Sequence, residues 1–117
     1  MAADPPVIYH NPRCSKSRDA LKLLQDAGVE VEVIEYLKTP PTAAQLRAIL
    51  NRLGMKPEDL VRKGEATYKE HYAGKTLSNA DWIAAMVEHP ILIERPIFVK
   101  GDKAVVGRPP EIVLHVC

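Results

Sequence analysis

The chain has 117 residues, of which 46% are hydrophobic and 26% are charged, and its formal net charge is +1. This length suits one domain, because two independent cores would leave each half near the lower size limit for folding alone. The acidic and basic residues are interspersed, so no global field draws nucleic acid or an anionic membrane to the chain. We therefore expect a single domain over residues 1–117 in which any anion binding is local.

The apolar runs are far shorter than the ~20 residues of a membrane helix, and the first residues lack the basic and apolar regions of a secretory signal. We therefore expect a cytoplasmic protein with no membrane and no nucleic-acid partner. The four histidines show neither i,i+4 pairing nor HExxH spacing. Cys14 and Cys117 lie too far apart in the sequence for a CxxC redox pair or a clustered zinc site. We predict no metal and no bound cofactor.

The first elements in the chain are predicted to be a strand, a helix and a second strand. Residues 7–10 form a short apolar run that ends at the turn signal Asn11-Pro12, which is typical of a buried strand. Residues 15–27 carry apolar side chains at helical spacing, and Gly28 follows them as a helix C-terminal signal. Over residues 29–36, valines first alternate with glutamates in the period-two pattern of a strand. The three elements predict a parallel βαβ unit.

The middle of the chain, about residues 42–90, is predicted to be a helical insertion. Thr42 and Gln45 fit a capping box at the start of a helix that ends at Gly54. A shorter helical turn is expected over residues 57–62. A further helix is expected to begin at Ser78 and to stop before Pro90, with apolar residues from Trp82 to Val87 on its buried face.

The last elements are predicted to be a β-hairpin and a short helix. Residues 96–99 and 104–106 are apolar runs on either side of Gly101-Asp102, a dipeptide suited to a type II′ turn. A short helix follows Pro110. The order of the elements favours an α/β protein with a four-stranded mixed sheet, flanking helices, and the helical insertion between the second strand and the hairpin. This arrangement is thioredoxin-like.

Cys14 is the first candidate for a catalytic residue. It lies in the predicted loop between the first strand and the first helix, where unpaired N–H groups and the positive helix end stabilise an anion. Arg13, Lys16 and Arg18 add positive charge. Because only the thiolate is a strong nucleophile, we predict that Cys14 is catalytic and that its pKa lies below the free value of ~8.5. The alternative, a buried small hydrophobe, fits a polar and cationic loop poorly.

Three polar residues near Cys14 have roles that the sequence leaves open. His10 can stabilise the thiolate as an imidazolium or shuttle a proton, but it can equally be a buried, hydrogen-bonded imidazole. Ser15 and Ser17 can cap the first helix, and their hydroxyls can also face a bound oxyanion. Of these two roles of the serine hydroxyls, helix capping is the preferred interpretation.

Three arginines, Arg62, Arg95 and Arg108, each stand next to a turn or a helix end. In the predicted fold, Arg95 precedes the third strand and Arg108 follows the fourth, so strand ends can bring both towards the Cys14 loop. The guanidinium fork suits a tetrahedral oxyanion, and a cysteine beside arginines points to thiol attack on such an anion. The alternative for each arginine alone is a solvated surface charge.

Segments along most of the chain resemble the glutaredoxin-linked arsenate reductase (ArsC) family of the thioredoxin-like superfamily. The segments that carry the resemblance are residues 9–18 around Cys14, 36–41, 60–63, 89–96 and 107–114. The resemblance implies that Cys14 attacks arsenate, that Arg62, Arg95 and Arg108 bind the oxyanion, and that the Arg95-Pro96 bond is cis. It also implies glutathione as co-substrate and glutaredoxin as the partner that restores the thiol after arsenite leaves.

Two alternatives to arsenate reduction stay open at this point. One is a glutathione-dependent thiol reductase with another substrate. The other is a regulatory binding protein of the same fold, which the absence of a CxxC pair near Cys14 and the presence of all three arginines make less favoured. Cys117 can resolve a reaction intermediate, although a terminal thiol without a role is the preferred interpretation.

Overall fold

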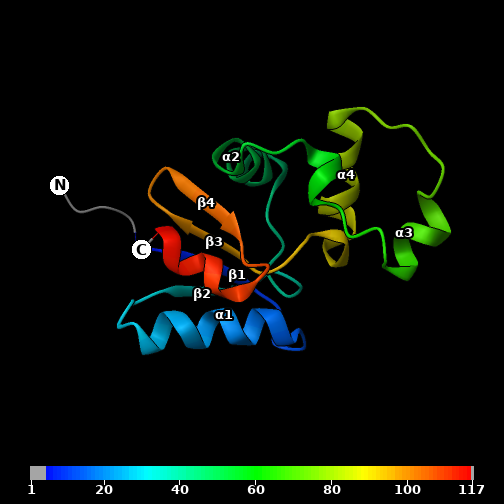
Figure 1. Cartoon of the computed structure of the whole chain (residues 1–117). Coiled ribbons are helices and arrows are strands. Elements are labelled where there is room, and N and C mark those ends of the chain that lie inside the picture. Colours follow the sequence, from blue (N-terminus) through cyan, green and yellow to red (C-terminus); the bar gives the residue numbers. More distant parts are fainter. Residues whose placement is uncertain (1–4, 117) are drawn as a thin grey trace. The chain divides into compact units, whose positions relative to one another are not determined.

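The computed structural model describes residues 5–116 and divides the chain into two compact units (Figure 1). The first unit combines the residues up to Thr39 with those from Arg95 onward, and the second runs from Pro40 to Glu94. The second unit is the helical insertion between the second strand and the hairpin. That the whole chain forms one domain stays a prediction.

The first unit contains a four-stranded mixed sheet with the strand order β2-β1-β3-β4. β1 pairs in parallel with β2 and antiparallel with β3, and β3 pairs antiparallel with β4. This topology confirms the predicted thioredoxin-like fold. The strands are β1 (Val7–His10), β2 (Glu32–Glu35), β3 (Ile97–Lys100) and β4 (Lys103–Val106).

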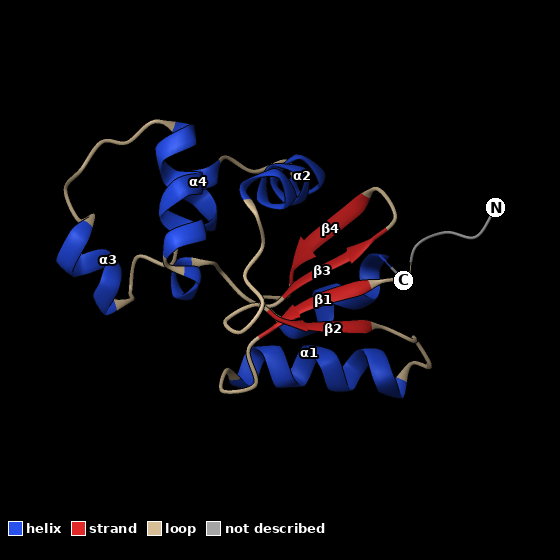
Figure 2. Ribbon diagram, turned by 180° about the vertical axis from the view of Figure 1, so that it is seen from behind, coloured by secondary structure: helices blue, strands red, loops and turns tan. Residues whose placement is uncertain are grey.

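The helix α1 (Ser15–Asp26) and the 3-10 helix η3 (Pro110–Val116) pack on the sheet of the first unit (Figure 2). The core between them is small and continuous, because Ile8 and Phe98 face each other across β1 and β3. Its fully buried members are Ile8, Ala20, Leu24, Phe98 and Val113. Removing this apolar surface from water fixes α1 against the sheet, and with it the position of the loop that precedes α1.

The second strand is shorter than the sequence predicts, so the expectation of a strand from residue 29 is wrong. β2 begins at Glu32, whose N–H donates to the carbonyl of Pro6 at 2.8 Å. β2 lies at the sheet edge, and its one neighbour β1 begins only after two prolines, which have no N–H to donate. Val29 and Val31 still pack against the core from the segment before the strand.

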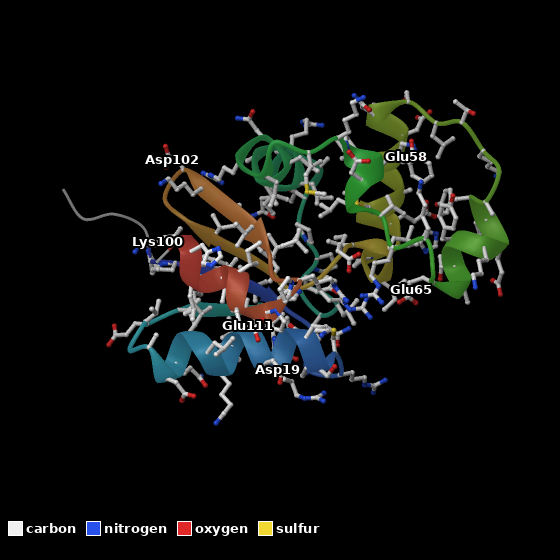
Figure 3. The ribbon with its side chains drawn as sticks, in the orientation of Figure 1. Asp19, Glu58, Glu65, Lys100, Asp102 and Glu111 are labelled. Carbon is white, nitrogen blue, oxygen red and sulfur yellow. The ribbon has the colours of Figure 1, made fainter. Side chains whose placement is uncertain are left out.

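The β3–β4 hairpin confirms the predicted turn between its strands. Gly101 has a φ of 61°, and no non-glycine residue from 5 to 116 has a positive φ. A positive φ at the first central residue alone is the signature of a type II′ turn, which glycine adopts without steric cost. Figure 3 shows Asp102 at the tip of this hairpin.

The second unit confirms two of the predicted helix starts. The Thr42 hydroxyl accepts the N–H of Gln45 at 3.1 Å while the Gln45 side chain accepts the N–H of Thr42 at 2.9 Å, a complete capping box. Ser78 accepts the N–H of Asp81 at 3.2 Å. The elements are α2 (Ala43–Leu53), η1 (Pro57–Leu60), α3 (Ala66–His71), α4 (Asn79–Glu88) and η2 (Pro90–Leu92).

Two details of the second unit differ from the expectation. The helical turn expected over residues 57–62 is a 3-10 helix that ends at Leu60, because Val61 and Ile93 form a β-bridge there. The short helix α3 was not predicted as a separate element, since it has no buried apolar face to give a periodic pattern. Among residues 5–116, no helix is long and apolar enough to cross a membrane.

Gly107 links the hairpin to the segment that carries Arg108. Its N–H donates to the carbonyl of Pro96 at 2.8 Å. A Cβ at this position would lie 2.8 Å from Cγ of Pro96 and 3.1 Å from Cγ1 of Val113. The close approach of these groups therefore requires glycine, and it holds the segment just before Arg108 against Pro96.

We predict that Gly107→Ala lowers the free energy of unfolding by about 1–3 kcal/mol, because the added methyl group overpacks a tight contact. Urea denaturation measures the change. Gly64→Ala is the matched control, since a Cβ there meets nothing within 4 Å, and its effect should stay within about 1 kcal/mol. Equal stability of both variants would show that the segment around Gly107 adapts without strain.

Candidate active site

Cys14 is the N-cap residue of α1, at the end of the loop that follows β1. Its backbone N–H donates to the carbonyl of Asn11 at 3.0 Å, and its carbonyl accepts the N–H of Arg18 at 3.0 Å. No side chain caps this helix. The thiol therefore stands where a capping oxygen usually does, beside the free N–H groups of the first helical turn.

The surroundings of Cys14 favour its thiolate. Burial by itself raises the pKa of the thiol, but the backbone N–H groups of Ser17 and Lys16 and the guanidinium of Arg95 outweigh it. The resulting pKa lies below the usual value of a cysteine. The direction of this shift agrees with the prediction, and the cause is local: helix N–H groups and one arginine, rather than the net charge of the chain.

The structure brings Arg95 and Arg108 to Cys14, as the predicted strand ends suggest. Nη2 of Arg108 lies 3.7 Å from Sγ of Cys14, and Nε of the same side chain donates to the carbonyl of Arg95 at 2.9 Å. Arg95 is buried, whereas Arg108 is exposed. Both Arg95-Pro96 and Arg108-Pro109 are cis peptide bonds, the first as the family resemblance implies. Two guanidinium groups and a helix N-terminus around one sulfur suit a tetrahedral anion bound to that sulfur.

His10 is a buried imidazole that is hydrogen-bonded to Ser17. Its Nδ1 is 2.6 Å from the hydroxyl oxygen of Ser17. Burial is the main reason that the pKa of His10 lies below its usual value, and Arg18 lowers this pKa further against the opposing effect of Glu35. A pKa below its usual value favours the neutral ring at pH 7, and the buried, hydrogen-bonded ring matches the alternative interpretation. The role of His10 as an imidazolium beside the thiolate stays a prediction. A proton shuttle through His10 stays a prediction.

Ser15 and Ser17 do not cap α1, so the capping prediction for both is wrong. The cap position belongs to Cys14, one residue earlier. The Ser17 side chain is fully buried, and its hydroxyl accepts the N–H of Asn11 at 3.0 Å in addition to its contact with His10. The Ser15 side chain is exposed, and its contact with a bound oxyanion stays a prediction.

Asn11 shapes the loop in a way that the sequence alone does not reveal. Its side-chain oxygen accepts the N–H of Arg13 at 3.0 Å, and its carbonyl accepts the N–H of Cys14. The residue is buried. In the sequence it is a turn signal before Pro12, and only this Asx-turn pattern could have indicated that its side chain orders the loop.

Arg62 belongs to the second unit, where two carboxylates hold its guanidinium. Nε lies 3.3 Å from Glu65 and Nη1 lies 3.2 Å from Glu94, and all three side chains are about three-quarters buried. Its backbone N–H donates to the carbonyl of Leu92 at 2.7 Å, next to the bridge between Val61 and Ile93. Figure 3 shows Glu65 at the start of α3. The predicted contact of Arg62 with an oxyanion stays a prediction.

Two further expectations concern a metal site and the terminal residue Cys117. Within the described residues, 5–116, no group of three or more His, Cys, Asp and Glu side chains could hold a metal ion. Cys117 lies outside these residues, so its role as a resolving or idle thiol stays a prediction.

We predict that Arg95→Gln raises the pKa of Cys14, because it removes both a hydrogen bond and a positive charge from the thiolate. The rate of alkylation by iodoacetamide, measured against pH, reports this pKa. Arg95→Lys keeps the charge and should raise the pKa less, and Arg47→Gln on the exposed face of α2 is the control for a change in net charge. An unchanged pH profile in Arg95→Gln would contradict the role of this arginine.

We predict that Ser17→Ala lowers the free energy of unfolding by about 1–3 kcal/mol, because it leaves the buried Asn11 N–H and the His10 ring without their partner. Ser15→Ala is the matched control and should change the stability by less than about 0.5 kcal/mol, since its side chain is exposed and caps nothing. Chemical denaturation measures both. A larger loss in Ser15→Ala than in Ser17→Ala would restore the capping interpretation.

Comparisons with known proteins identify the family of this chain. The profile of the ArsC family matches residues 9–116. The chain is 54% identical over 111 residues to the uncharacterized protein YfgD of Escherichia coli K12, with 93% of both chains covered, and 45% identical to an arsenate reductase of Neisseria meningitidis serogroup A, with 89% and 91% covered. Among solved structures, an arsenate reductase from Vibrio cholerae matches with a TM-score of 0.93 at 46% identity, covering 99% of this chain and 100% of that one. Since the family profile matches residues 9–116 and relatives of about 45% identity cover nine-tenths or more of their own length, the chain belongs to the ArsC family.

Proposed function

We propose that the protein is an arsenate reductase that converts arsenate to arsenite through the Cys14 thiolate. The observation that carries this proposal is the position of Cys14 Sγ at the N-terminus of α1, 3.7 Å from the guanidinium of Arg108. Arg95 is also close enough to lower the pKa of the thiol through a hydrogen bond and its positive charge. Relatives at 45% identity that bear the name arsenate reductase support the choice of substrate.

In the first step, the thiolate attacks arsenic. An S–As bond forms, the As–O bond of an As–OH group breaks, and the released hydroxide takes up one proton from solvent and leaves as water. The guanidinium groups of Arg95 and Arg108 donate to the remaining oxygens, where they stabilise the charge of the anion and of the covalent adduct. Arg62 is the third proposed oxyanion ligand, and Ser15 the proposed hydroxyl donor.

In the second step, the proposed reductant is glutathione. Its thiolate attacks the Cys14 sulfur of the adduct, the S–As bond breaks, and arsenic leaves with the electron pair as arsenite. The two sulfurs are thereby oxidised to a mixed disulfide, and arsenic is reduced from the +5 to the +3 state. A glutaredoxin thiol then takes over the glutathione sulfur and restores Cys14. This route needs one cysteine at the site, which fits a loop without a CxxC pair.

The second candidate is a glutathione-dependent thiol reductase that acts on another substrate. The observation that favours it is the greater identity of the chain, 54%, to the uncharacterized protein YfgD than to the named arsenate reductase at 45%. The same thiolate and arginines would then serve a different electrophile. The regulatory binding role has no observation of its own in its favour.

The test is arsenite formation from arsenate with glutathione, glutaredoxin and an NADPH-coupled recycling system. We expect turnover in the wild type, loss of turnover in Cys14→Ser, a fall of about 10²-fold or more in kcat/KM for Arg62→Ala, and little change for Cys117→Ser. If the wild-type protein did not turn over arsenate, the proposal that it is an arsenate reductase would be rejected. Loss of turnover in Cys117→Ser would instead indicate an internal resolving thiol.

A further inference from the structure

A pocket of about 200 Å³ lies beside the Cys14 loop in the first unit. One wall is the end of β1 with Pro12 and Arg13, and the other is the end of β2 with Glu35, Leu37 and Lys38. His10 and Glu35, the last residues of these two parallel strands, are register partners. Ligands of open α/β sheets bind outside such carboxyl ends. The pocket is therefore placed for a small molecule, and Cys14 is the next residue after its Arg13 wall.

The apolar part of the pocket is open to solvent. Leu37 is one of three large hydrophobic side chains in the described residues with an exposed fraction above about a third, at 40%. Together with Pro12 it offers apolar surface to the methylene groups of a ligand.

The charged part of the pocket carries two cations and one carboxylate. Arg13 and Lys38 are positive and Glu35 is negative, and burial lowers the pKa of His10, which favours its neutral ring. Nζ of Lys38 lies 3.6 Å from Glu35, in an ion pair whose lysine side chain is 79% exposed. Exposed pairs of this kind contribute little, so both groups are available to a ligand.

We propose that this pocket holds the γ-glutamyl end of the thiol co-substrate, a small peptide thiol of the glutathione class. The inference rests on the proposed function. Glutathione carries two carboxylates and one ammonium group, a net charge of −1 that complements the net charge of +1 from Arg13, Lys38 and Glu35. The γ-glutamyl carboxylate pairs with Lys38, its ammonium with Glu35, and its methylene groups cover Leu37.

The size of the pocket sets which part of the co-substrate it takes. Sites that enclose a whole ligand measure about 300–1,000 Å³, so a pocket of about 200 Å³ holds one end of a tripeptide. The central cysteine of the tripeptide then lies outside the pocket, and the proposal directs it toward Cys14, the residue that follows Arg13. The glycine also lies outside the enclosed volume, where its carboxylate pairs with the guanidinium at the end of the long Arg13 side chain. Specificity for the thiol thus resides in residues separate from the arginines of the oxyanion site.

The experiment separates binding of the thiol from binding of arsenate. S-methylglutathione, which cannot react, is titrated into the full-length protein and its Kd is measured by NMR or calorimetry. In parallel, KM for glutathione and KM for arsenate are measured. Lys38→Glu and Leu37→Asp are the test variants. Lys22→Glu is the matched control, because Lys22 forms an exposed local ion pair with Asp26 on α1 that resembles the pair of Lys38.

We expect Lys38→Glu and Leu37→Asp to raise the Kd for S-methylglutathione and the KM for glutathione about fivefold or more, with KM for arsenate within about twofold. Lys22→Glu should change neither. No binding of S-methylglutathione by the wild type, or equal Kd values in wild type and both test variants, would overturn the inference. Binding that depends on Lys38 in a protein without arsenate turnover would support the pocket and reject only the arsenate proposal.

Discussion

The active-site loop depends on one buried hydroxyl, that of Ser17. It accepts the N–H of Asn11 at 3.0 Å and meets the His10 ring at 2.6 Å, so it ties the end of β1 to the first turn of α1. The same turn presents the N–H groups of Lys16 and Ser17 to the Cys14 sulfur. A buried hydroxyl that satisfies two neighbours has few alternative positions, since each alternative leaves a polar group unpaired. The direction of the helix N–H groups, and with it the low thiol pKa, follows from this contact.

The scaffold supplies the arginines from the opposite end of the sequence. Arg95 precedes β3 and Arg108 follows β4, so one antiparallel hairpin beside β1 carries both. The hydrogen bond from Nε of Arg108 to the Arg95 carbonyl and the tight contact of Gly107 with Pro96 fix their spacing. Neither arginine needs a long loop to reach the sulfur. Because both arginines flank a hairpin that pairs with β1, a sheet of four short strands can hold a site made of residues that are distant in the sequence.

The sequence predicts the parts of this protein that local chemistry decides. The capping box at Thr42, the turn at Gly101 and the strand at Val7 each follow from a few adjacent residues, and the structure confirms them. The sequence predicts wrongly where residues distant in the chain determine the structure. β2 begins later than predicted because its neighbour β1 is short. The Ser17 hydroxyl does not cap α1 because it contacts Asn11 and His10 instead. The predicted strand order was enough to place Arg95 and Arg108 near Cys14. The ion pairs of Arg62 with Glu65 and Glu94, by contrast, could not be predicted from any sequence pattern.

In the proposed reaction, the site serves two anions in turn, the Cys14 thiolate and the oxyanion. The charge of Arg95 stabilises the thiolate in the free protein, yet an oxyanion that approaches the same sulfur needs that charge as well. A single arginine would therefore lose part of its stabilisation of the thiolate when the substrate binds. The exposed Arg108, 3.7 Å from the sulfur, supplies a second guanidinium, and the N–H groups of Lys16 and Ser17 stay on the thiolate whatever the arginines do. In the proposed reaction, the fixed N-terminus of α1 and two separate guanidinium groups allow an anionic nucleophile and an anionic electrophile to occupy the same site.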